Sequence, residues 1–200
     1  MQLTARPLRN ARVTLEPMAP AHREDLRAAC DADPETWVRL YPFSMAGEHF
    51  DAGWTRLQDD VAAGRMIQFA VVVDGACVGM TSYIAPDAVN RTVEIGATYY
   101  HPEHRGGPVN PAAKRLLLGE AFEAGANRVC LKVDAINARS RAAVLKLGAT
   151  QEGILRQDRV VWTGRIRDTV VFSILAAEWP AVRDRLDHRL AQIPSSSPGD

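Results

Sequence analysis

The residues best suited to chemistry lie in the loop from His101 to Asn110, directly behind the strand-like run TVEIGATYY. Gly106 and Gly107 lack a Cβ atom, so main-chain amides beside them can approach a ligand closely. Asn110 followed by Pro111 is typical of a helix start, with Asn110 as the cap. A helix N-terminus binds anions, above all phosphates, although a glycine pair can also simply turn a strand into a helix. The loop fits neither GxxxxGK[ST] nor GxGxxG, so nucleoside triphosphates and dinucleotides lose support.

A second polar motif, Asn137 to Ser140, follows the buried run RVCLKVD. Asn137 is predicted to cap a helix, because an amide oxygen at this position accepts from the free N–H groups of the first turn. The apolar positions Ala143, Val144 and Leu147 recur at helical spacing behind it. The motif therefore marks a second helix start close to a strand end.

Hydrophobic periodicity gives the elements that must position these two motifs. Asp74-Gly75 between two apolar runs predicts a hairpin over Ile67–Ile84. The order strand, helix, strand, helix from TVEI to KLG predicts a right-handed crossover between neighbouring parallel strands. The other expected strands are 12–18, 152–162 and 165–175, and the other expected helices are 21–31, 47–64 and about 176–191. We expect a mixed sheet covered by helices on both faces.

Composition narrows the class of protein. The chain has 200 residues, of which 46% are hydrophobic, and this suits one domain over 1–193 followed by a disordered tail, 194–200. Lys+Arg 24 balances Asp+Glu 24, which argues against a large nucleic-acid footprint. No run approaches a membrane span and no signal peptide is apparent, so a cytoplasmic protein is expected. Cys30, Cys77 and Cys130 are predicted to be reduced thiols, and no metal site is expected.

Taken together, these segments resemble the GNAT acetyltransferase superfamily, specifically its RimJ/RimL-like branch. The resemblance rests on EIGATYY, HRGGPVN, PAAKRLLLGEAF, RVCLKVD and NARSRAAVLKLGATQEGILR, and it extends from RVTLEPM through RDTVVFSIL. It implies an α/β (α+β) fold with a mixed, mostly antiparallel sheet and a central splayed parallel strand pair. It also implies acetyl-CoA as cosubstrate.

The resemblance assigns the loop to the pyrophosphate of acetyl-CoA. The family pattern [QR]-x-x-G-x-[GA] falls on the segment from Arg105 to Asn110, but Pro108 and Asn110 replace its two glycines. Pro108 has no N–H, so the donors would have to come from neighbouring amides or from the first helical turn. The residues implied in CoA binding are Tyr99, Tyr100, His101, Arg105, Gly106, Gly107, Val109, Asn110, Lys114, Asn137 and Ser140. His101 is also compatible with a turn residue, and Lys114 with a solvated helix face.

The implied activity is transfer of an acetyl group to a primary amine by direct attack in a ternary complex. A neutral amine is required, so a carboxylate near the thioester would take its proton. Glu94 is the first candidate, although it could simply pair with Arg91, and Asp134 is the second. Ser140 is implied as the acid that protonates the departing thiolate. In the late strand the register places Arg159, rather than Asp158, at the position where some relatives carry an acid.

The acceptor is predicted only as a class, a protein N-terminus or a small amine. Residues implied to wall its pocket are Trp37, Tyr41, Phe43 and Trp162, each of which could also be a core residue. A homodimer is plausible for this branch. The alternative function is a non-catalytic GNAT-fold protein that binds an acyl-CoA or a partner, which the departures at Pro108 and Arg159 favour.

Overall fold

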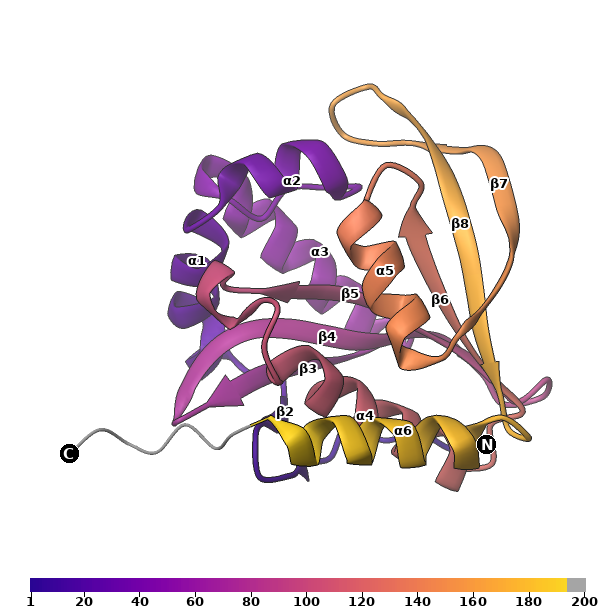
Figure 1. Ribbon diagram of the computed structural model, residues 1–200. Helices are drawn as coiled ribbons and strands as arrows, with labels where there is room; N and C mark the ends of the chain where they lie inside the picture. Colours follow the sequence, from indigo (N-terminus) through magenta and orange to yellow (C-terminus); the bar gives the residue numbers. More distant parts are fainter. Residues whose placement is uncertain (194–200) are drawn as a thin grey trace.

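The computed structural model describes residues 1–193, which form one continuous eight-stranded sheet with helices on both faces (Figure 1). The predicted tail, 194–200, lies outside the described residues. The strands are β1 (Leu8–Arg9), β2 (Thr14–Pro17), β3 (Met66–Val73), β4 (Ala76–Asp87), β5 (Thr92–Tyr100), β6 (Arg128–Asp134), β7 (Thr150–Val160) and β8 (Ile166–Leu175). Their order across the sheet is β1-β2-β3-β4-β5-β6-β8-β7.

Five of the six helices described within residues 1–193 lie where the hydrophobic pattern indicated, and α2 (Pro34–Leu40) is the exception. They are α1 (Arg23–Asp31), α2 (Pro34–Leu40), α3 (Phe50–Ala62), α4 (Val109–Glu123), α5 (Ala138–Leu147) and α6 (Trp179–Gln192). Short 3-10 turns η1 (Pro20–His22), η2 (Gly47–His49) and η3 (Pro102–His104) precede α1, α3 and the loop before α4. The predicted hairpin is confirmed, because Asp74 and Gly75 join β3 to β4 with φ angles of 50° and 85°.

The predicted parallel pair is also confirmed. β5 and β6 are parallel neighbours joined by α4, and every other pairing in the sheet is antiparallel. The two strands pair only from Thr92 to Glu94 with Arg128 to Cys130. Beyond Glu94 and Cys130 they are no longer paired with each other, so the sheet opens at its centre.

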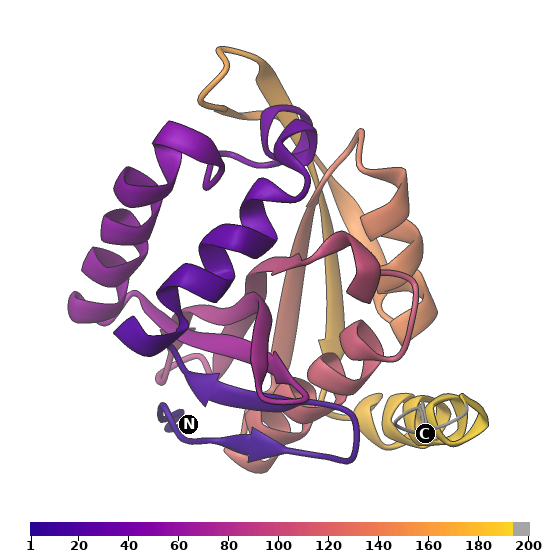
Figure 2. The same cartoon turned by 90° about the vertical axis from the view of Figure 1, so that its left-hand side faces the viewer.

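Each face of the sheet carries its own buried cluster. On one face, Leu26, Phe50 and Leu57 from α1 and α3 pack on strand residues such as Met80 and Tyr99. On the other, apolar residues of α4, α5 and α6 pack on Val93 and Ile95 of β5, Val129, Leu131 and Val133 of β6, and Val170, Phe172 and Ile174 of β8. Figure 2 shows the two groups of helices on opposite sides of the sheet. Alternate residues of β6 and β8 therefore point to opposite helix layers.

Three details differ from the sequence prediction. Helix α4 starts at Val109 with Pro108 in the N-cap position, so Asn110 lies inside the first turn and the expected Asn110 cap is wrong. Proline at 108 already has a helical φ of −75°, and the helix starts two residues earlier than predicted. Helix α2, capped by Asp33, was not predicted because its seven residues give too short a pattern. Helix α6 begins at Trp179 rather than at 176.

Several features concern the class of protein rather than the site. Cys30, Cys77 and Cys130 are all unpaired thiols, as predicted. Within residues 1–193 no three His, Cys, Asp or Glu side chains converge as a metal site would require. None of the helices described in that range has the length and apolar character needed to cross a bilayer.

Candidate active site

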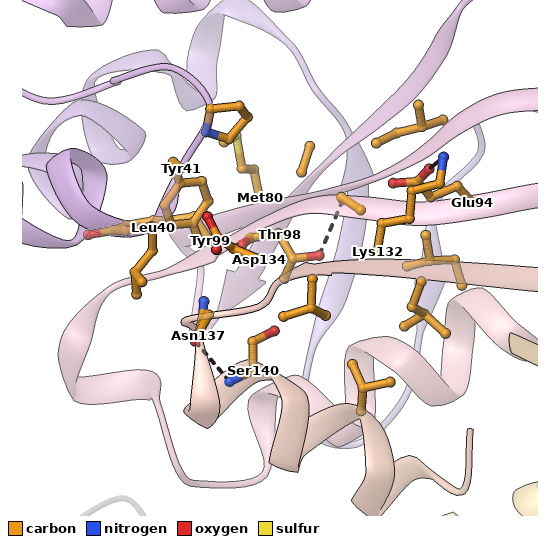
Figure 3. A pocket seen from close by; sticks show the side chains of 18 of the residues that line it. Leu40, Tyr41, Met80, Glu94, Thr98, Tyr99, Lys132, Asp134, Asn137 and Ser140 are labelled. Atoms are coloured by element: carbon orange, nitrogen blue, oxygen red, sulfur yellow. Dashed lines mark hydrogen bonds and ion pairs between the residues drawn. The ribbon is translucent and has the colours of Figure 1, made fainter. Parts of the chain in front are cut away.

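A cavity of about 370 Å³ occupies the opening between β5 and β6 (Figure 3). Its lining comes from both faces of the sheet. Leu131, Val133 and Val144 border it on the α5 side, and Phe43 and Leu57 border it on the α3 side. Side chains from both helix layers therefore border one cavity inside the sheet.

The N-terminus of α4 forms one end of this cavity, where Gly106 and Asn110 belong to the lining. The first helical hydrogen bond runs from the amide of Ala112 to the carbonyl of Pro108. Within the described chain, the amides of Gly106, Gly107, Val109 and Asn110 donate to no protein acceptor. Four free N–H groups at the positive end of a 15-residue helix are a site for an anion.

The glycines of this loop have distinct roles. Gly106 has a φ of +79°, a conformation that favours glycine over residues with a side chain. A Cβ atom added at either Gly106 or Gly107 would meet no atom within 4 Å, so open space lies next to the free amides. This combination of open space and unpaired donors is suited to an anion.

Arg105 joins the loop to the opposite helix layer. Its Nη1 is hydrogen-bonded to the Asp33 carboxylate, its Nε donates to the carbonyl of Tyr100 at 2.8 Å, and its guanidinium lies 5.0 Å from the Tyr99 ring centroid. The Nη2 group is buried and has no hydrogen-bond partner. Because a buried guanidinium N–H without an acceptor is costly, this atom is a candidate contact for a phosphate oxygen.

The Asn137–Ser140 motif lies across the cavity from this loop. Asn137 caps α5 as predicted, accepting from the Ser140 amide at 3.0 Å. The cap uses only the main chain of Ser140, and its hydroxyl has no protein partner within residues 1–193. Both side chains line the cavity (Figure 3), so the Ser140 hydroxyl is available to a ligand.

Glu94 lies on the cavity wall where β5 and β6 begin to separate. Its Oε2 is 2.9 Å from Nζ of Lys132 on the neighbouring strand, and Figure 3 shows the two side chains pointing toward each other. The partner is therefore Lys132, and the expectation of a pair with Arg91 is wrong. Hydrogen bonding to Glu94 raises the pKa of Lys132. A carboxylate whose own charge is balanced in this way can still accept a proton from an amine, directly or through water.

Asp134 also lines the cavity, but its oxygens are occupied. One oxygen accepts from the amide of Ile136 at 3.2 Å, and the other is bonded to Arg165 and lies 3.9 Å from Nε of Arg167. The side chain is 1% exposed. These contacts favour a role in holding the two arginines rather than in moving protons.

A β-bulge shapes the middle of β5. Ser82 pairs with Gly96 and Met80 with Tyr99, so two residues of β5, Ala97 and Thr98, stand opposite Thr81 alone. Ala97 has a φ of 45°, and both bulge residues line the cavity. The Thr98 carbonyl accepts from the Tyr41 hydroxyl at 2.6 Å, which ties the bulge to the segment after α2.

Lys114 of α4 reaches this bulge from the other face. Its Nζ donates to Oγ1 of Thr98 at 2.7 Å and to Oγ1 of Thr81 at 3.3 Å. The residue is 5% exposed, so the expectation of a solvated helix face is wrong. Within the described chain no carboxylate lies within ion-pair distance of Nζ, and burial lowers the pKa of this lysine to about 7.

The four aromatic residues predicted to wall an acceptor pocket divide into two pairs. Tyr41 and Phe43 line the cavity, and Trp37 and Trp162 are not part of its lining. Trp37 is fully buried, stacks on Tyr99 at 4.5 Å and donates from Nε1 to the carbonyl of Cys30. Nε1 of Trp162 in turn donates to the carbonyl of Trp37. The two tryptophans thus support the wall from behind.

Of the remaining residues predicted to bind CoA, some line the cavity and others lie outside it. Tyr99 and Tyr100 line the cavity, and the Tyr100 hydroxyl is buried without a partner, whereas the Tyr99 hydroxyl donates to the carbonyl of Ala29. His101 lies outside the lining, where its Nδ1 accepts from the amide of Glu103. The Val109 side chain is part of the core, so only its main chain can serve the loop.

Sequence reasoning missed four basic residues that line the cavity, Arg56, Lys132, Arg139 and Arg167. The alternation of RVCLKVD already places Lys132 and Asp134 on one strand face, opposite Val129, Leu131 and Val133. Arg159, rather than Asp158, lines the cavity, as the register predicted. The position of Arg56 on α3 depends on tertiary packing and has no local signal.

Comparison with known proteins agrees with this geometry. The family model described as "Acetyltransferase (GNAT) domain" matches residues 12–150. The chain therefore belongs to the GNAT acetyltransferase family. Its sheet, mostly antiparallel with one parallel pair, is the fold of that family.

Individual relatives extend over most of the chain. A Bacillus subtilis (strain 168) protein named "Putative ribosomal N-acetyltransferase YdaF" is 35% identical over 127 residues, which cover 63% of this chain and 67% of that protein. The crystal structure of a GCN5-related N-acetyltransferase from Brucella melitensis is 29% identical, covers 99% of this chain and 91% of that chain, and has a TM-score of 0.87. The structure of Mycobacterium smegmatis RimJ in complex with CoA-disulfide is 25% identical, covers 92% of both chains and has a TM-score of 0.77.

Proposed function

We propose that this chain is a cytoplasmic N-acetyltransferase that transfers the acetyl group of acetyl-CoA to a primary amine in a ternary complex. The observation that carries the proposal is the cavity that crosses the sheet, with free amides at one end and a carboxylate on its far wall. The named RimJ relative holds CoA-disulfide, which supports the same ligand here. The proposed acceptor is a peptide N-terminus or a small amine, and the name of the Bacillus subtilis relative, a ribosomal N-acetyltransferase, supports the first of these.

Acetyl-CoA supplies the activated acyl group, and this chain's residues hold it and manage the protons. The free amides of Gly106, Gly107, Val109 and Asn110 would bind the pyrophosphate at the N-terminus of α4. The buried Nη2 of Arg105 would donate to the same anion. Pro108 contributes no amide, but its early helical turn leaves the amides of the next two residues unpaired.

In the transfer, the amine nitrogen forms a bond to the acetyl carbon and the carbon–sulfur bond breaks. Glu94 takes the proton that the amine loses, directly or through a water molecule. Ser140, whose hydroxyl has no protein partner in the described chain, gives a proton to the departing thiolate. Glu94 then releases its proton to water and Ser140 regains a proton from water. The net reaction converts an amine and a thioester into an N-acetyl amine and a free thiol, with both residues returned to their starting states.

The bulge at Ala97 and Thr98 would provide a hydrogen-bond donor to the acyl oxygen. A bulge leaves main-chain groups outside the regular ladder, and the two residues border the cavity between Glu94 and Ser140 in the fold. A main-chain amide aimed at the carbonyl would stabilise the negative charge that develops on it.

Isothermal titration with acetyl-CoA, followed by thiol release with a panel of amines and peptides, tests the proposal. Gly107→Asp should weaken acetyl-CoA binding at least about tenfold, because it adds a negative charge where phosphate oxygens would lie. Gly153→Asp on β7 is the matched control, since a Cβ atom there also meets nothing within 4 Å. Binding without turnover on any acceptor would favour the non-catalytic alternative, and equal affinity of both variants would remove the loop from the site.

A further inference from the structure

The acceptor side of the cavity is richer in cations than acetyl transfer to an amine requires. Asp134 pairs with Thr169 across β6 and β8, and Arg167 pairs with Arg159 across β8 and β7, so these side chains share one face of the sheet. Lys132 shares this face as well, because it is two residues from Asp134. Val133 and Val170 between them point to the α4, α5 and α6 layer, which carries the proposed CoA site. The basic group therefore faces the opposite entrance.

Arg167 is the central observation. The residue is 7% exposed and lines the cavity, and its Nε donates to Oγ1 of Thr169 at 3.0 Å. Its nearest carboxylate oxygen, on Asp134, is 3.9 Å from Nε and is already bonded to Arg165. Within residues 1–193 its two Nη groups have no hydrogen-bond acceptor. Burial lowers the pKa of Arg167, and the attraction of Asp134 opposes this shift.

The carboxylates around Arg167 are already engaged. Glu94 is bonded to Lys132, and Asp134 is shared between two arginines. Asp158 is held by Thr169 at 2.7 Å and by Arg159 at 3.2 Å. None of these acids has a free oxygen positioned for the Nη groups of Arg167, so the cluster lacks one anion.

A further arginine borders the cavity on its α3 wall. Arg56 lies 4.8 Å over the Phe43 ring and forms no ion pair with the described part of the chain. The carboxylate on this wall, Asp60, is paired with Arg65 at 2.7 Å and so does not neutralise Arg56. Both walls of the acceptor entrance thus offer guanidinium donors, the group best suited to carboxylate and phosphate oxygens.

We propose that the acceptor carries an anionic group, a carboxylate or a phosphate, close to its reactive amine, and that Arg167 binds this group with help from Arg56. This inference rests on the proposed function and specifies its substrate class. An acceptor of this kind supplies the missing anion, while Glu94 on the same face receives the amine proton. Arg167 is then a residue that selects the acceptor and takes no part in acetyl-CoA binding.

Matched acceptors test the inference with the full-length protein. Thiol release at saturating acetyl-CoA is measured for the peptides Ser-Asp-Ala-amide and Ser-Asn-Ala-amide, for glutamate and glutamate diamide, and for phosphoethanolamine and ethanolamine. The member of a pair that carries the anion should have a kcat/KM at least tenfold higher, mainly through KM. The pair with the largest ratio identifies whether a side-chain carboxylate, a free amino acid or a phosphate is the source of the anion.

The variants separate recognition from folding. Arg167→Met should abolish the preference within the pair and leave acetyl-CoA affinity within about twofold, and Arg167→Lys should restore part of it. Arg56→Gln, at an exposed helix position, should reduce the preference without affecting the fold. Arg183→Met on α6, where the side chain pairs with the adjacent Asp184, is the control and should change nothing.

The outcomes distinguish this inference from the proposed function. Equal use of charged and neutral acceptors, or an equal loss on both members of a pair in Arg167→Met, would overturn the inference and leave an acetyltransferase. Absence of turnover on every acceptor would overturn both.

Discussion

Lys114 gives the sharpest quantitative prediction, because it is a buried lysine without a carboxylate partner. Burial lowers its pKa from 10.5 to about 7 in the folded protein, whereas the unfolded chain exposes it to water. Well below pH 7 the lysine is protonated in both states, and the lowered pKa corresponds to a cost on the order of a few kcal/mol to the folded state. Lys114→Met removes the charge and keeps an unbranched apolar chain in the same space.

The sign of the pH dependence follows from proton counting. Between pH 7 and 10.5 the unfolded chain holds a proton on Lys114 that the folded protein has released, so the free energy of unfolding rises with pH. From pH 7 to pH 9 this contribution amounts to about 2 kcal/mol. Lys114→Met should lack it and should be more stable than the parent protein at pH 6. The loss of stability in the variant is confined to two hydrogen bonds, and Thr81 and Thr98 can still bond each other at 2.8 Å.

Urea unfolding at pH 6, 7, 8 and 9, without CoA, measures the effect as a difference between the two proteins. All other titratable groups are common to both proteins, so the difference between the two curves isolates the contribution of Lys114. Lys146→Met, at an exposed position near the end of α5, is the control and should run parallel to the parent protein. If the Lys114→Met curve is also parallel to the parent, Lys114 remains charged when folded and the reasoning from burial is refuted.

Two predictions concern the chemical step. Ser140→Ala should lower kcat about 100-fold and leave acetyl-CoA affinity within twofold, because the cap of α5 uses the Ser140 amide and not its hydroxyl. Stopped-flow detection of the thiol measures kcat, and titration measures the affinity. An unchanged kcat would show that the Ser140 hydroxyl has no part in the reaction. Glu94→Gln should lower kcat by about 100-fold or more with little change in the fold. If Lys132→Met lowers kcat by this amount and Glu94→Gln leaves it unchanged, Glu94 is not the group that accepts the proton.

Local patterns were sufficient for the framework of the site. Contacts within a few residues or chain connectivity determine the Asn137 cap, the Asp74-Gly75 hairpin and the parallel pair, and each of these three is confirmed. The start of α4 was predicted two residues late because Asn followed by Pro is a common cap, whereas Pro108 already adopts a helical φ.

Side-chain partners across the sheet could not be predicted in the same way. RIRDTVV places Arg165, Arg167 and Thr169 on one strand face, but only the register between β6 and β8 brings Asp134 to them. Lys114 did carry a local signal: it precedes the buried Leu117 and Leu118 by three and four residues, which puts it on the inner face of α4. Its polar character led to the wrong expectation of a solvated position. Trp37 shows the opposite case, where an aromatic residue assigned to a pocket is part of the core behind it.

The separation of β5 from β6 has a consequence for the order of events. Because residues from both faces of the sheet line the opening, the proposed ternary complex would let each reactant bind from its own face, and neither would have to depart before the other arrives. Initial-rate plots against one reactant at several fixed levels of the other should then intersect rather than run parallel. In such a complex the acetylated product and the free thiol would dissociate from opposite faces of the sheet, so a high concentration of one would not block release of the other.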